Sequence, residues 1–336
     1  MKQEQFESLY RDQWQRFESL LSQLERRSPK PTAPDLAAFP GLYRQVCQFL
    51  ALAQERCYSA YLIDELNDLV LRGHHLLYVR QTGFWGSIGR FLALDFPNLV
   101  RQEQVFIWIA FGLLYLPALL FFVALQLEPH LVYSLMEPAQ VTDFERMYNP
   151  SGEHIGRNRE SDSDFMMFGY YIYNNISVAF RCFAGGLLLM LGSVVSLVFN
   201  GLLLGGVAGH LTNLGYPQTL FSFVIGHGAF ELTAIGIAGG AGLKLGYSVI
   251  VPGRLTRLAS LKSAAATGIR LMYGVILMLL IAAFIEAFWS SNGSLAPALK
   301  YGVGAMLWSL VLIYLGWSGR GRGMKLSHLT AKSHHL

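Results

Sequence analysis

Long apolar stretches dominate the sequence after residue 104, and they limit what the chain can fold into. A helix needs about 20 apolar residues to cross the hydrocarbon core of a bilayer. The stretch over residues 170–214 is therefore long enough for two crossings, with the break expected between Leu191 and Gly201. Four further crossings complete a predicted set of six spans, and they lie at residues 105–125, 219–240, 268–288 and 297–317.

The uneven distribution of charge divides the chain into three parts. Only 14% of the residues are charged, against about 25% in soluble proteins. We predict an all-α polytopic membrane protein with a cytoplasmic or interfacial helical module at 1–104, a transmembrane domain at 105–317 and a basic tail at 318–336. Apolar residues three and four apart predict amphipathic helices in the module, at residues 3–28, 35–58 and 59–78.

Loop charge predicts how the spans are oriented. The segment 241–267 has basic residues and no acidic one, whereas the segment 126–168 is rich in acidic residues. Basic loops stay in the cytoplasm, so the acidic segment is predicted outside and both termini inside. The net charge of +4 is too small to indicate nucleic-acid binding. The three cysteines lack CxxC spacing and are expected to be reduced thiols.

Six polar or ionisable residues lie at predicted membrane depth, where such groups usually face the bundle interior or a water-filled cavity. Four of them form the candidate polar cluster: Asn200, His210, His227 and Glu231. The other two, Arg181 and Glu286, are predicted to form an ion pair, because a lone charge at that depth is costly.

The most specific signal in this cluster is the pair of His227 and Glu231, because residues four apart share one face of a helix. They could bind a metal, relay a proton or form a structural hydrogen-bond cluster, and the structural interpretation is favoured. The HExxH pattern is absent and no third ligand follows at fixed spacing. The sequence therefore predicts no metal, no cofactor and no catalytic residues.

Glycines at small-residue spacing predict close packing between helices. Gly201, Gly205 and Gly209 repeat every four residues on the third span, and Gly226 and Gly228 flank His227. The turn between the third and fourth spans is short. We therefore expect these two helices to be antiparallel neighbours in close contact at Gly205 and Gly209.

Several segments together carry a family resemblance. They are Asn200–Gly205, Gly226–Leu232, Ile285–Phe288 and Tyr173–Phe180, with residues 42–44 and 74–78 in the N-terminal module. The chain resembles the stage II sporulation protein M family of integral membrane proteins, and the module resembles that of its longer Gram-negative members. Thr233 stands where the family pattern has Pro, so a fixed kink is not expected there.

The resemblance implies a multi-pass component of the bacterial inner membrane with no established enzymatic activity. The family's namesake resembles a membrane anchor in a complex that remodels peptidoglycan during engulfment. Longer members resemble proteins encoded beside AAA+ ATPases and von Willebrand-type proteins. The expected partners are membrane lipids, other membrane or envelope proteins and a second copy of the chain.

Three functions stay open at this point. A scaffold or anchor is favoured by the resemblance and by the lack of a complete catalytic constellation. A transporter or channel would use His210, His227 and Glu231 in a continuous hydrated path. An intramembrane metal hydrolase would need a bound metal.

Overall fold

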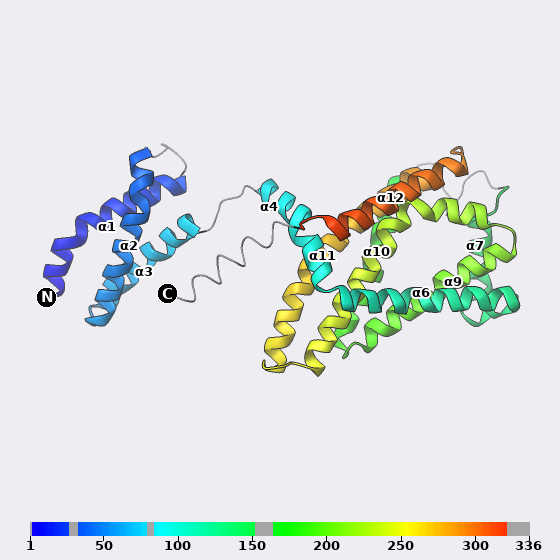
Figure 1. The fold of residues 1–336 in the computed structure, drawn as a ribbon, viewed down its shortest axis with the longest axis horizontal. Coiled ribbons are helices and arrows are strands. Elements are labelled where there is room, and N and C mark those ends of the chain that lie inside the picture. The colour runs from blue at the N-terminus through cyan, green and yellow to red at the C-terminus, as the bar shows by residue number, and fades with distance from the viewer. Residues whose placement is uncertain (1, 27–32, 79–83, 152–163, 321–336) are drawn as a thin grey trace. The chain divides into compact units, whose positions relative to one another are not determined.

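The computed structural model describes residues 2–26, 33–78, 84–151 and 164–320, and every regular element in these ranges is helical. The predicted all-α fold is therefore confirmed. The chain forms two compact units, Met1–Ser87 and Ile88–Leu336, and each is described here by itself. Figure 1 shows the helices of both units.

The first unit consists of three helices that bury large side chains. They are α1 (Gln3–Arg26), α2 (Ala33–Glu55) and α3 (Ala60–Tyr78), close to the predicted ranges. Phe6, Trp14 and Phe17 of α1 are buried in the core of this unit, as the spacing predicted. Leu9, another apolar residue of α1, is 58% exposed.

The second unit is a larger helical assembly that contains the apolar helices. The short helix α4 (Phe84–Arg90) spans the boundary between the two units. The described elements after it are η1 (Phe91–Asp95), α5 (Phe96–Gln102), α6 (Gln104–Leu127), η2 (Pro129–Ser134), α7 (Pro138–Met147), α8 (Asp164–Ala184), η3 (Gly185–Leu187), α9 (Leu191–Asn213), α10 (Pro217–Ile250), α11 (Arg257–Ile285), η4 (Glu286–Ser290) and α12 (Pro297–Trp317).

Five described helices are long and apolar enough to cross a membrane. They are α6, α9, α10, α11 with η4, and α12. The predicted second span corresponds to α8, which does not reach the same hydropathy. Even so, α8 packs along α10, because Asn175 lines a cavity with His227 and the carbonyl of Cys182 lies against Gly242.

Two predicted boundaries differ from the structure. The break between the second and third spans falls at Leu188–Met190, before Leu191, and Met190 has a φ of 73°. The backbones of Gly185 and Gly192 lie in contact across this turn, which only glycine permits on both sides. The fourth helix does not end at Gly240 but continues to Ile250, since its last glycines are packed inside the bundle.

The central helix of the second unit is α10, the most enclosed of the five apolar helices. It packs against α6, α8, α9, α11 and α12. The glycines of α9 contact α6 rather than α10, which corrects the prediction for the third span. Gly201 lies against the backbone of Leu114, and Gly205 against that of Ala118, so α6 and α9 run parallel and side by side (Figure 1).

Candidate functional site

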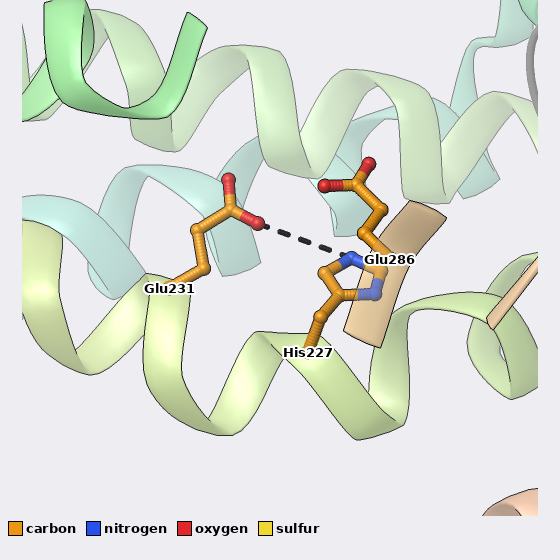
Figure 2. A group of neighbouring side chains, drawn as sticks. All are labelled: His227, Glu231 and Glu286. Carbon is orange, nitrogen blue, oxygen red and sulfur yellow. Dashed lines mark ion pairs between the residues drawn. The ribbon is translucent and has the colours of Figure 1, made fainter. Parts of the chain in front are cut away.

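Three ionisable side chains converge on one point beside the first half of α10. His227 and Glu231 lie four residues apart on α10, and His227 Nε2 is 3.9 Å from Glu231 Oε2. Glu286 reaches the same point from η4, at the end of the following long helix. One ligand-type atom from each of the three lies within 4.8 Å of the others. Figure 2 shows the three side chains side by side.

A chain of polar contacts holds the imidazole of His227 from its other side. His227 Nδ1 lies 3.1 Å from Ser290 Oγ, and the backbone carbonyl of Ser290 accepts a 2.8 Å hydrogen bond from Lys300 Nζ. Lys300 is only 1% exposed. The ring of Phe223 packs edge-on against the imidazole. These contacts fix the ring with Nε2 directed toward the carboxylate of Glu231.

The three side chains border a cavity of about 220 Å³. Polar and aromatic groups line it: Tyr148, Tyr170, Tyr171, Asn174, Asn175, Phe223, His227, Glu231 and Glu286, together with residues of α7 and α9. The helix α7, from the acidic segment predicted to lie outside the membrane, covers part of this cavity with Phe144 and Met147. Thr219 Oγ1 also donates to the carbonyl of Tyr148 over 2.7 Å, which ties the segment to α10.

The cavity borders α10 only as far as Leu232. Further along the helix, glycines lie directly against other helices. Gly236 meets the ring of Phe111, Gly239 meets Leu197, and Gly240 lies on Ile107. The polar cavity and the glycine-packed region therefore occupy successive halves of the same helix.

The predicted four-residue polar cluster is divided in the structure. His227 and Glu231 belong to the site, but His210 pairs with Glu145 of α7, with Nε2 2.8 Å from Oε1. Asn200 donates its side-chain amide to the carbonyl of Ser196 within α9, over 2.7 Å. The prediction that these four residues gather was wrong because periodicity along one helix does not reveal which neighbouring helix each residue faces.

The predicted pair of Arg181 and Glu286 is also absent. Helix α8 begins at Asp164, so Arg181 lies in its last turn and is exposed. That turn is at the level of Gly242, whereas Glu286 is buried beside His227. The sequence placed Arg181 near the start of its span, and the error in the helix boundary produced the false pair.

Four residues of the site were missed as partners of His227 and Glu231. Glu286 was assigned to a different pair, and Asn175, Ser290 and Lys300 were not considered. Lys300 carried a usable signal, because an ionisable residue at the start of an apolar helix is expensive unless it has a buried partner. Spacing rules could not identify Glu286 as the third ligand-type residue, since it lies far from His227 and Glu231 in the sequence.

Two carboxylates and an imidazole beside one cavity can bind a divalent cation or share a proton. Both carboxylates are enclosed: the Glu231 side chain is 20% exposed and Glu286 is 9% exposed. Among the described residues, this is the group whose ligand-type atoms are close enough for a metal ion.

Comparison with known proteins agrees with this description of a polytopic all-α membrane protein. A family model described as stage II sporulation protein M matches residues 105–291, more than half of the chain. The chain therefore belongs to the stage II sporulation protein M family, as its motifs predicted. A second model, a domain of unknown function (DUF8413), matches residues 4–79 within the first unit.

One curated relative comes from an archaeon. Uncharacterized protein MJ0793 of Methanocaldococcus jannaschii is 30% identical over 128 residues, which make up 36% of this chain and 69% of the relative. No solved structure matches the chain significantly.

Proposed function

We propose that this protein is a membrane-embedded anchor of a multi-protein assembly at the cell envelope, in the inner membrane of a bacterium. The carrying observation is the division of the chain into two compact units. The first has its own aromatic core and its own family match, and the second contains the helices that can cross a membrane. This organisation suits a protein that holds a partner-binding module at the membrane.

The helical arrangement supports six crossings with both termini in the cytoplasm. Helix α8 packs against α10 beside the cavity and at Gly242, and counting it as a span makes the number even. Cysteines introduced at Pro150 and Leu258, both exposed, test this orientation. Position 150 should react with a membrane-impermeant reagent from outside, and position 258 only after permeabilisation. The reverse pattern would exclude this topology.

Site-specific photo-crosslinking in the native host tests the anchoring role. A photo-reactive residue replaces Tyr61, which is 78% exposed, or Leu71, which is 55% exposed, on α3 of the first unit. We expect discrete adducts with one envelope or cytoplasmic protein. The control position is Leu66 on the same helix, which is 0% exposed and should give none. Equal adducts at all three positions, or none at any, would contradict the proposal.

Transport is the second candidate, and the polar cavity is the observation that favours it. A conduit would have to continue past Leu232, where the glycines of α10 lie against Phe111 and Leu197. Purified protein in liposomes should therefore not accelerate the flux of protons or divalent cations. Flux that disappears in Glu231→Gln would favour the transporter over the anchor.

A further inference from the structure

We propose that His227, Glu231 and Glu286 bind a divalent transition-metal ion, with zinc as the ion that the ligands suit best. The proposal concerns the cavity beside α10 and does not depend on the anchoring role of the first unit. One imidazole nitrogen and two carboxylate oxygens form a mixed ligand set. Such sets suit Zn²⁺ and neighbouring transition metals better than Ca²⁺ or Mg²⁺, which favour oxygen alone.

The spacing of the three side chains is close to that of a metal centre. Zinc ligands lie about 2.0–2.2 Å from the ion, which puts neighbouring ligand atoms roughly 3.3 Å apart. The ligand-type atoms here lie within 4.8 Å of one another, and the His227–Glu231 separation is 3.9 Å. Glutamate side chains have three rotatable bonds, so small rotations can close the remaining gap without movement of the backbone.

The orientation of His227 is the one that a metal ligand requires. A ligating histidine normally uses its second ring nitrogen for a hydrogen bond that fixes the ring. Here Nδ1 contacts Ser290 Oγ at 3.1 Å, and Nε2 is left facing Glu231. The carbonyl of Ser290 is itself held by Lys300. The supporting contacts of a metal-bound histidine are therefore already in place.

The helix backbone is irregular at Glu286, where the chain contributes two residues to the site. Residues Glu286–Ser290 form a π-helical turn at the end of α11, and such turns often occur at functional sites. This turn brings both Glu286 and Ser290 to His227. Gly226 allows the close approach, because a Cβ atom there would lie 2.9 Å from the ring of Trp289.

An unsatisfied polar atom in the cavity points independently to a ligand. Asn175 is 2% exposed and lines the cavity with the three ligand residues. Its Oδ1 accepts a hydrogen bond from Asn174, but its Nδ2 has no hydrogen-bond partner among the described residues. A buried amide of this kind is costly. A further ligand of the metal ion, held in the cavity, would supply the missing acceptor.

Charge favours a divalent ion over a monovalent one. The charge of an ion such as Zn²⁺ is equal and opposite to that of two carboxylate ligands when both are ionised. The alternative is a cluster held by shared protons, with the same residues and no metal. Direct binding measurements separate these two states.

The test uses the full chain, purified with a histidine-free tag and reconstituted in nanodiscs after treatment with a chelator. Zinc content is measured by mass spectrometry, affinity by competition with a fluorescent chelator, and coordination by the absorption of the Co²⁺ form. We expect one ion per chain and a Co²⁺ spectrum that Zn²⁺ abolishes one for one. Glu286→Gln and His227→Gln should each weaken binding at least about 100-fold.

Two further variants separate metal binding from a general loss of structure. Ser290→Ala keeps all three ligands and the carbonyl that Lys300 contacts, and it should weaken binding about 10-fold. His210→Gln alters the partly exposed pair of His210 with Glu145 and should leave zinc affinity unchanged. Monodisperse elution shows which variants are folded.

Two results would overturn the proposal. One is a wild-type protein that takes up no more zinc and shows no more Co²⁺ absorption than the His227→Gln variant. The other is equal affinity in wild type, Ser290→Ala and Glu286→Gln. Should a ligand variant fail to fold, the wild-type Co²⁺ spectrum and the zinc affinity of Ser290→Ala decide between a bound metal ion and a cluster held by shared protons.

Discussion

The helix α10 changes character along its length, and its two halves show two uses of a membrane helix. Over Pro217–Leu232 it borders a polar cavity with His227 and Glu231. Over Thr233–Ile250 its glycines lie on the side chains or backbones of α6, α8 and α9. The first half borders space for an ion or water, whereas the glycines of the second half lie in direct contact with neighbouring helices. Glycines in the two halves therefore have different tasks, which substitutions can separate.

The largest expected effect comes from Gly242 in the packed half. A methyl group there would overlap the carbonyl of Cys182 and the hydroxyl of Ser193. Gly242→Ala should lower the free energy of unfolding by about 1–3 kcal/mol or more, measured by unfolding in detergent. The matched control is Gly228→Ala in the cavity half, where the nearest atom is a methyl group of Val224 on the same helix, at 3.3 Å rather than below 3.0 Å. Equal losses of unfolding free energy in the two variants would contradict the distinction between the two halves of α10.

Removal of the buried charge next to the site should have the next largest effect. Lys300→Met leaves the carbonyl of Ser290 without its ammonium partner, and an unmade buried hydrogen bond costs about 1–3 kcal/mol. Thermal unfolding in nanodiscs measures the loss. Lys262→Met removes an exposed lysine and should shift the midpoint little. A Lys300→Met midpoint equal to that of the control would show that the contact contributes nothing.

Gly226→Ala should affect the site more than the fold. The added methyl group would press on the Trp289 ring and move the π-helical turn, and with it Glu286, away from His227. We expect zinc affinity to fall about 10-fold while the unfolding midpoint changes by less than in Gly242→Ala. Affinity equal to that of wild type would mean that the close approach at Gly226 does not set the geometry of the ligands.

The smallest effect is expected at the second histidine–glutamate pair. His210 and Glu145 have side chains that are 12% and 36% exposed, so the pair is partly solvated. Such pairs contribute at most about 1 kcal/mol. Glu145→Gln should therefore change the unfolding free energy by less than that amount, as read from denaturant titration. A larger loss would show that docking of α7 depends on this contact.

Sequence reasoning was successful where the signal is local. Apolar runs predicted the membrane helices, and the spacing of His227 and Glu231 placed them on one face of a helix. Sequence reasoning failed where the contact partner of a residue comes from a distant segment of the chain. Glu286 and Lys300 join the site through the packing of α11 and α12 against α10, and no local pattern encodes that packing. The early end of α8 was missed because glycine contacts, and not polar residues, set the turn.

The most direct test of the division of α10 is the reactivity of single cysteines along it toward a hydrophilic thiol reagent. The background is a chain without the three native cysteines, with single substitutions at Val224, Leu232, Ala234 and Ala238. Cysteines at Val224 and Leu232 line the cavity and should react, whereas those at Ala234 and Ala238 are packed at 0% exposure and should not. Reaction that continues through Ala238, or no reaction at any of the four positions, would contradict the account.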